Sequence, residues 1–567
     1  MQPTNGFAVP RLSRTLMLIE IGLPLVLLVL GIYHGFLQTL YRAGLLQSAS
    51  FAGLNYYQGL TLHGVINAVV LTTFFGVAFG NGIMQYYLRQ ALTPWVHALS
   101  TGLMVVGTLI AAVPMLLGKA DVLYTFYPPL KAHPAFYIGA ALLVVGSWIA
   151  FFGWLPLVRH WYRAHPDEPL PLAVLGILVS FLIWFLCTIP LAVEVLFMLI
   201  PWSLGWVSSI NIPLARTLFW FFGHPLVYFW LLPAYVVYYV MLPKAAGGKL
   251  YSPYAARLVF ILFLVLSIPV GLHHQYTEPG FERFWKGVHA LLTFAVAIPS
   301  FITAFTVAAS LEYAGVQRGG QGLFGWMAKL PWFDASRPIV AYSLAGLLIF
   351  IFGGLTGIVN ASYNLNQTIH NTGFISGHFH MTVGGPVFLV ILGMSLELFS
   401  QLTGKPIRGK GWNIAVPYLW MLGLFIFSPA MMVGGLLGQP RRTNMGLSYL
   451  DPSSPHFRLD WVVTSYLAAI GGVILLIAFV IYLGVWVATV AGPAERPAGY
   501  LAFPTAEGLH PDVSTASILN RLRPWLGLAL LLVLVSYWAP LRQALRTPQS
   551  APPYEPDNPA PIVRLEK

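Results

Sequence analysis

The stretch GHFHMTV, residues 377–383, places two histidines, His378 and His380, inside a long apolar run. An imidazole is costly to bury in hydrocarbon unless its nitrogens have partners. Each residue of an α-helix turns the chain by about 100°, so side chains two positions apart point about 200° away from each other. If both histidines are ligands, they therefore serve two different centres on opposite sides of one helix.

The composition is that of an integral membrane protein. Of the 567 residues, 57% are hydrophobic and only 8% are charged, whereas a soluble protein carries roughly 25% charged residues. The apolar runs have the length of membrane helices rather than the short alternation of barrel strands. The fold class that we predict is an all-α polytopic membrane protein. The net charge of +12 comes without a polybasic run, which argues against nucleic acid as a partner.

The apolar runs predict about thirteen transmembrane helices, at 15–37, 58–87, 95–118, 134–158, 171–200, 213–242, 255–275, 287–311, 338–360, 373–400, 412–437, 461–489 and 523–545. This divides the chain into an N-terminal segment (1–14), a transmembrane bundle (15–545) and an extended C-terminal tail (546–567). More than half of the Lys and Arg residues fall in the connections on the N-terminal side. The positive-inside rule therefore predicts a cytoplasmic N-terminus and a C-terminus outside.

Six histidines from four spans fall in the outer half of the predicted membrane, namely His63, His224, His273, His274, His378 and His380. Any one of them could be a hydrogen-bonded core residue. Six at one depth favour metal sites, because neutral imidazole is a common ligand of iron and copper. Six ligands divide as two for a six-coordinate haem, one for a five-coordinate haem, and three for a copper with an open position.

On this division, the helix that carries His378 and His380 separates two haems. His63 supplies the second axial ligand of one of them.

The other three histidines are expected to share one metal. His273 and His274 are adjacent and can converge on it if the helix end is irregular, and His224 can complete the set. Tyr228 lies four residues after His224, on the same helical face. This tyrosine is either a packing residue or a donor of an electron and a proton.

These segments carry a resemblance to a known family. GHPLVY (223–228), HH (273–274), GHFHMTV (377–383) and YYQGLTLHGV (56–65) resemble signature segments of subunit I of the haem–copper oxidases. Further similar segments are LYTFYPPLK (123–131), GLFGW (322–326) and PRR (440–442). The sequence most closely resembles the B-type branch, the ba-type cytochrome c oxidases.

The resemblance implies a role for each ligand. His63 and His380 would bind a low-spin haem of b-type, and His378 would bind a high-spin haem of a-type. The copper called CuB would be held by His224, His273 and His274. Tyr228 would be joined covalently to His224.

Haem propionates are expected near the outer loops. The resemblance places Arg441 and Arg442 against them, which suits the bidentate pairing of arginine with carboxylates. Asn366 and His370 belong to the same region. The resemblance implies an aspartate at position 366, and the amide of Asn366 cannot exchange a proton as a carboxylate does. A second departure is Leu226, where the A-type branch has the glutamate that ends one proton channel.

Two stripes of hydroxyl groups run inward from the predicted copper site. They comprise Tyr228, Tyr235 and Tyr239 on one span and Thr293, Ser300, Thr303 and Thr306 on another, with Ser252 near the inner connection. Such groups also serve as contacts between membrane helices. Their direction and the resemblance favour a single proton pathway of the K type. Glu194, a carboxyl group within a span, is expected to pair with a polar group, the alternative being a part in proton movement.

The resemblance implies the catalytic subunit of a respiratory terminal oxidase in a prokaryotic cytoplasmic (inner) membrane, which reduces dioxygen to water and pumps protons. The only cysteine is Cys187, so a dinuclear copper centre must belong to a partner, subunit II, that takes electrons from cytochrome c. A small single-helix subunit is a further expected partner. The alternatives are a quinol oxidase, a nitric oxide reductase, against which Tyr228 and Leu226 argue, and a haem-free proton-coupled transporter.

Overall fold

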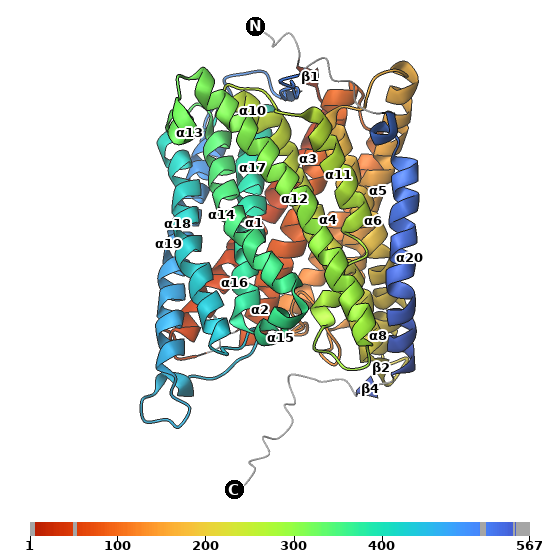
Figure 1. The fold of residues 1–567 in the computed structure, drawn as a ribbon, viewed down its shortest axis with the longest axis vertical. Coiled ribbons are helices and arrows are strands. Elements are labelled where there is room, and N and C mark those ends of the chain that lie inside the picture. Colours follow the sequence, from red (N-terminus) through yellow and green to blue (C-terminus); the bar gives the residue numbers. More distant parts are fainter. Residues whose placement is uncertain (1–5, 49–53, 511–516, 548–549, 552–567) are drawn as a thin grey trace.

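Long apolar runs become helices that run from one end of the molecule to the other (Figure 1). The computed structural model describes residues 6–48, 54–510, 517–547 and 550–551. Eight spans are uninterrupted helices: α1 (Arg11–Arg42), α4 (Pro94–Leu116), α5 (Pro134–Ala164), α12 (Arg283–Gln317), α14 (Pro338–Ala361), α18 (Lys410–Leu436), α19 (Leu459–Ala491) and α20 (Leu522–Arg546).

Four further spans each contain a π-helical turn. They are α2 (Tyr56–Val65), η1 (Ile66–Val70) and α3 (Leu71–Leu88); α6 (Leu172–Glu194), η2 (Val195–Leu199) and α7 (Ile200–Ser203); α8 (Ile212–Gly223), α9 (Pro225–Val236), η3 (Val237–Met241) and α10 (Leu242–Ala245); and α16 (Gly373–Thr382), η6 (Val383–Val387) and α17 (Phe388–Thr403). Such turns are frequent at functional sites. These four spans are also the most deeply buried, and three of them carry predicted ligands.

The remaining elements are short. The helices are α11 (Pro253–Leu266), α13 (Gly322–Gly325) and α15 (Tyr363–Ile369), and the 3₁₀ turns are η4 (Leu272–Gln275), η5 (Met327–Lys329), η7 (Ser448–Leu450) and η8 (Ser517–Asn520). Two antiparallel strand pairs join segments far apart in the sequence. β1 (Phe7–Ala8) pairs with β3 (Tyr500–Leu501), and β2 (Ile210–Asn211) pairs with β4 (Ser550–Ala551).

The predicted span 255–275 differs from the observed one. α11 has only 14 residues, and the chain then bends and enters η4. Pro269 follows the helix, and proline cannot donate the backbone hydrogen bond that would continue it. α11 is therefore too short to be counted among the twelve long apolar helices. The first helix was predicted to begin at residue 15, whereas α1 begins earlier in the sequence, at Arg11.

The chain nevertheless makes an odd number of crossings. Figure 1 shows β1 at the upper end and β4 at the lower end. Twelve crossings would return the chain to its starting side, so α11 and η4 together provide the thirteenth. Most of the predicted tail, 546–567, lies outside the described residues.

Close helix contacts depend on small residues. An added Cβ at Gly139 of α5 would lie 2.4 Å from the carbonyl oxygen of Gly107 of α4. Only glycine allows these backbones to approach so closely, as is usual between membrane helices.

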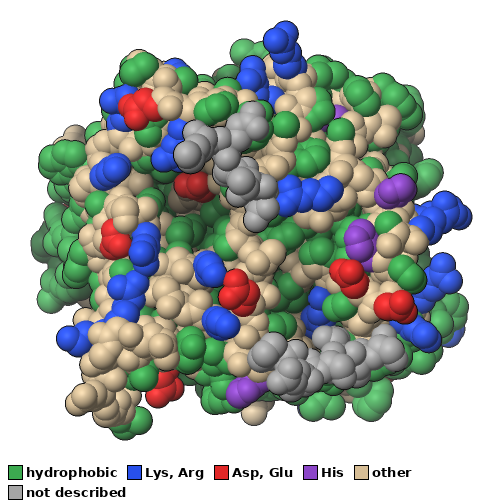
Figure 2. All heavy atoms as spheres, turned by 90° about the horizontal axis from the view of Figure 1, so that it is seen from above, with side chains coloured by type: hydrophobic (Ala, Val, Ile, Leu, Met, Phe, Trp, Pro, Cys, Tyr) green, Lys and Arg blue, Asp and Glu red, His purple; other side chains and the backbone are tan. Residues whose placement is uncertain are grey.

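The end of the bundle that carries β1 and α10 has many polar side chains, and its rim is apolar (Figure 2). Figure 2 shows the end that carries β1 and α10, with Lys and Arg side chains spread over its surface and hydrophobic side chains around the edge. This distribution suits a membrane protein whose basic end faces the cytoplasm.

The orientation can be tested by labelling in a Cys187→Ser background. Ser336 and Ser453 are exposed in connections at opposite ends. Because the basic end is expected inside, a membrane-impermeant maleimide should label a Ser453→Cys variant on intact cells and a Ser336→Cys variant only after permeabilisation. The reverse pattern would contradict the predicted N-in topology.

Candidate functional site

Three imidazoles meet at the junction of α8, α9 and η4. His224 sits between α8 and α9, and His273 and His274 lie on η4. One ring nitrogen of each lies within 4.8 Å of the others, and His224 Nδ1 is 3.3 Å from His274 Nε2. The irregular helix end that the adjacent pair required is the 3₁₀ turn. The prediction that these three histidines converge is confirmed.

Hydrogen bonds determine which ring nitrogens of these histidines remain available to bind a metal. Thr293 Oγ1 donates to the carbonyl of His289 at 2.6 Å and so accepts from His273 Nδ1 at 3.1 Å. This leaves His273 Nε2 with its lone pair. His224 Nε2 is 2.9 Å from the hydroxyl of Tyr228, which leaves His224 Nδ1 facing the other rings. Three imidazoles arranged in this way suit a copper ion, and the hydroxyl groups of Thr293 and Tyr228 orient two of the rings.

A second pair of imidazoles has the spacing of two axial ligands. The rings of His63 on α2 and His380 on α16 are nearly parallel, at 19°, with centroids 6.1 Å apart. Imidazole nitrogen bonds a metal at about 2 Å, so two rings with one metal between them have centroids about 6 Å apart. His63 Nδ1 donates to the carbonyl of Gly31 and His380 Nδ1 to that of Ser376, each at 2.8 Å. Both Nε2 atoms therefore remain free to bind.

His378 occupies the other side of α16. Thr356 Oγ1 donates to the carbonyl of Gly353 and accepts from His378 Nδ1, both at 2.8 Å. Thr356 was not predicted as a site residue, because nothing in its sequence context distinguishes it from other membrane threonines. Its only signal was its place among glycines in GGLTG.

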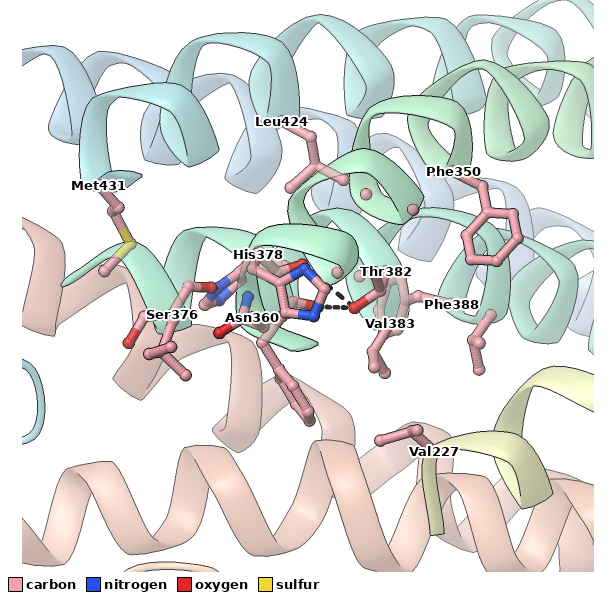
Figure 3. Close-up of a pocket in the computed structure, with 18 of the residues that line it drawn as sticks. Val227, Phe350, Asn360, Ser376, His378, Thr382, Val383, Phe388, Leu424 and Met431 are labelled. Atoms are coloured by element: carbon pink, nitrogen blue, oxygen red, sulfur yellow. Dashed lines mark hydrogen bonds between the residues drawn. The ribbon is translucent and has the colours of Figure 1, made fainter. Parts of the chain in front are cut away.

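One cavity of about 760 Å³ joins these sites, and all six histidines line it. Figure 3 shows His378 at its wall, together with Asn360, Val383 and Leu424. The cavity runs from the histidines to the inner ends of α12 and α14, where Trp326 and Met327 line it.

The outer edge of the cavity is cationic. Arg441 is in a loop, and its Nε has no hydrogen-bond partner among the described residues. Burial, together with Arg442, lowers the pKa of Arg441 to about 9. Burial and the nearby Arg441 lower the pKa of His370 to about 4. Asn366 is buried beside them and its Oδ1 is also unpartnered. A half-buried guanidinium that forms no ion pair within the described residues fits a bound carboxylate.

The two hydroxyl stripes meet at two points. Tyr239 Oη lies 2.6 Å from Thr303 Oγ1, and Tyr235 Oη donates to Ser300 Oγ at 3.3 Å. Hydrogen bonds between the described residues do not connect all of the predicted hydroxyl groups. Thr306 Oγ1 has no partner within the described chain.

Ser252 does not join the stripes through a hydrogen bond. Its hydroxyl caps α11 by accepting from Ala255 N at 3.1 Å.

Two carboxyl groups in the outer half differ in their surroundings. Glu278 forms an ion pair with Arg216 at 3.2 Å and accepts from Gln275 at 2.9 Å. The expectation that Glu194 pairs with a polar group is wrong. It is fully buried, and neither carboxyl oxygen has a hydrogen-bond partner in the described structure.

Comparison with known proteins places the chain. A model of the family described as "Cytochrome C and Quinol oxidase polypeptide I" matches residues 16–474. The chain belongs to this family.

Its relatives include cytochrome c oxidase subunit 1 of Thermus thermophilus, which is 42% identical over 86% of each chain. The alternative cytochrome c oxidase subunit 1 of Bradyrhizobium diazoefficiens is 25% identical over 72% of this chain and 71% of that protein. A solved structure of a heme-copper terminal oxidase dimer contains a chain with a TM-score of 0.94 and 50% identity, which covers 98% of this chain and 97% of that one. Haems and copper are the cofactors of this family.

Gly35 makes room for the His63 ring. An added Cβ at Gly35 would lie 2.4 Å from His63 Nδ1, whereas one at Gly22 of the same helix would meet nothing within 4 Å. We expect Gly35→Ala to displace His63 and to reduce the low-spin haem absorbance, while Gly22→Ala leaves it unchanged. Absorption spectra of the two purified variants measure this. Equal spectra would show that His63 does not depend on this close fit.

Proposed function

We propose that this chain is the catalytic subunit of a respiratory terminal oxidase that reduces dioxygen to water with electrons from cytochrome c and translocates protons. The observation that carries the proposal is α16, which presents His380 to the His63 ring and His378 to the side of the three-histidine cluster. One helix thus separates a two-ligand site from a one-ligand site beside a candidate copper centre.

The ligand roles follow from this arrangement. His63 and His380 would hold a low-spin haem, His378 a high-spin haem, and His224, His273 and His274 would hold CuB. When bound, these groups supply electron transfer and dioxygen reduction.

Tyr228 is proposed as the donor of an electron and a proton at the copper site. Its hydroxyl contacts His224 Nε2 at 2.9 Å. This contact supports the proposed covalent link between the two side chains.

The cationic edge is proposed to bind haem propionates. Arg441 and Arg442 would pair with the carboxylates, and His370 and Asn366 would lie beside them. The unpartnered Arg441 Nε and Asn366 Oδ1 support this assignment. An amide cannot exchange a proton as a carboxylate does, so we assign Asn366 a hydrogen-bonding role and leave proton exchange to His370.

We assign the chain to the B-type branch of the family. Leu226, which stands where an A-type oxidase carries a glutamate, supports this assignment. We propose a b-type low-spin haem and an a-type high-spin haem. The apolar extension of the cavity along α12 and α14, lined by residues such as Phe301 and Ile351, suits the isoprenoid tail of an a-type haem.

Protons are proposed to enter from the cytoplasmic end along the hydroxyl stripes. The Tyr239–Thr303 and Tyr235–Ser300 contacts form the middle of the route. The remaining members, Tyr228 and Thr293 at the copper end and Thr306 and Ser252 at the inner end, would be linked by water. Thr293 already contacts His273, which ties the stripe to the copper ligands.

The partners are proposed from the residues that the chain lacks. A dinuclear copper centre needs two thiolates, and the sequence contains only Cys187, which is buried. Subunit II would therefore carry that centre and receive electrons from cytochrome c. A small single-helix subunit and the lipid of a prokaryotic cytoplasmic membrane complete the assembly.

The donor can be tested with the purified complex. The family also contains quinol oxidases, so dioxygen uptake should be measured separately with reduced cytochrome c and with a quinol, with haem content recorded in each sample. We expect uptake with cytochrome c. Uptake with quinol alone would agree with the proposed active site but would identify a quinol, rather than cytochrome c, as the electron donor. A haem-loaded complex that consumes dioxygen with neither donor would contradict the oxidase assignment and favour nitric oxide reduction.

The proton route can be tested at Thr303. Removing its hydroxyl in Thr303→Val breaks the contact with Tyr239, so we expect turnover to fall by about tenfold or more, in line with the loss of a proton-transfer group. Tyr235→Phe should act in the same direction. The matched control is Thr72→Val, because Thr72 is also buried and bonds only its own helix backbone. Unchanged haem spectra with normal turnover in both pathway variants would refute the route.

A further inference from the structure

The last helix, α20, contacts both segments that carry the proposed copper ligands. The buried Tyr537 is the point of contact. Its ring stacks on Phe221 of α8, three residues before His224, with centroids 3.9 Å apart and planes at 6°. Its hydroxyl accepts a hydrogen bond of 2.7 Å from the backbone N–H of Gly271, at the start of η4. One side chain therefore joins the α8 end to the turn that carries His273 and His274.

His289 of α12 makes a second connection between α20 and the same turn. Its Nδ1 accepts from Leu272 N at 3.3 Å, and its Nε2 donates to the carbonyl of Ser536 at 3.1 Å. The His289 carbonyl accepts from Thr293, the residue that holds His273 Nδ1. His289 is fully buried, and the proposed reaction assigns it no role.

The backbone at Gly271 is enclosed on two sides. A Cβ added there would lie 2.2 Å from Tyr537 Oη and 2.2 Å from the carbonyl oxygen of Trp220. Trp220 in turn stacks on the His274 ring, with centroids 3.7 Å apart. Glycine therefore lets η4 lie directly between α8 and α20.

We propose that Tyr537, assisted by His289, is a positioning residue for the copper ligands, and that α20 sets the distance between the α8 end and η4. The inference rests on the proposed function, since it takes the three histidines as copper ligands.

The local structure explains why the turn that carries His273 and His274 needs support from other helices. η4 is a single 3₁₀ turn of four residues, and its backbone has no helical ladder to define its place. A metal site requires its ligands to be held in position by surrounding hydrogen bonds. Tyr537 and His289 accept from two consecutive backbone N–H groups of this turn, those of Gly271 and Leu272.

The test compares Tyr537→Phe with Tyr482→Phe. Both changes remove one hydroxyl from a buried tyrosine, but Tyr482 bonds the carbonyl of Leu392, at 3.0 Å, on α17. In the assembled complex, copper retention is titrated against a copper chelator, and the infrared band of carbon monoxide transferred to copper by photolysis is recorded. We expect Tyr537→Phe to weaken copper retention by about tenfold, as the loss of a hydrogen bond that supports metal ligands does, and to shift or broaden that band. Tyr482→Phe should leave both unchanged.

The low-spin haem absorbance reports whether each variant folds. If Tyr537→Phe does not fold, Phe221→Leu replaces it, because this change removes the ring contact and keeps the hydroxyl; we expect a weaker effect in the same direction. Copper retention and an infrared band equal to those of Tyr482→Phe would overturn the positioning role. A wild-type complex that binds no copper would instead refute the proposed function.

Discussion

The structure depends on one constraint: an imidazole in the interior of a membrane protein needs a partner for each of its nitrogens. His378 and His380 satisfy it in opposite directions from one helix. One nitrogen of each ring bonds a nearby oxygen, that of Thr356 or that of the Ser376 carbonyl, and the other faces the cavity. Because the two rings leave α16 on different sides, the helix lies between them, and in the proposed function it would separate two haem centres.

Three of the other proposed metal ligands are also held by hydrogen bonds or polar contacts. His63 bonds the carbonyl of Gly31 of α1, His273 bonds Thr293 of α12, and His224 contacts Tyr228. Each ring is thus oriented before any metal binds, which favours binding because little reorganisation remains. The spans that hold His63 and His224 are among the most buried and contain π-helical turns, whereas α12, α19 and α20 form the periphery. Although α20 lies at the periphery, the hydroxyl of its Tyr537 accepts a hydrogen bond from Gly271 N at the start of η4.

Local pattern was sufficient for the long membrane helices, for the grouping of His224, His273 and His274, and for placing His378 and His380 on different sides of one helix, because these depend on hydropathy and helical spacing. Local pattern did not predict the features that depend on contacts between segments far apart in the sequence. The span at 255–275 was too long, since the chain leaves the helix at Pro269 to place η4. The contact of Tyr537 with Gly271, the bond of Thr356 with His378 and the ion pair of Arg216 with Glu278 join residues whose sequence context gives no signal. Glu194 was expected to pair, but a polar residue in an apolar run does not reveal whether a partner faces it.

The most direct test of the central claim, that α16 separates two haem centres beside a copper, is the cofactor content of the purified chain in its complex. Pyridine haemochrome spectra and elemental analysis give haem, iron and copper per chain, and electron paramagnetic resonance gives the spin state of each haem. Any copper carried by a partner subunit is subtracted by measuring that subunit alone. The account predicts two haems, one low-spin and one high-spin, and one copper. A single haem, or two haems of the same spin state with no copper, would contradict it.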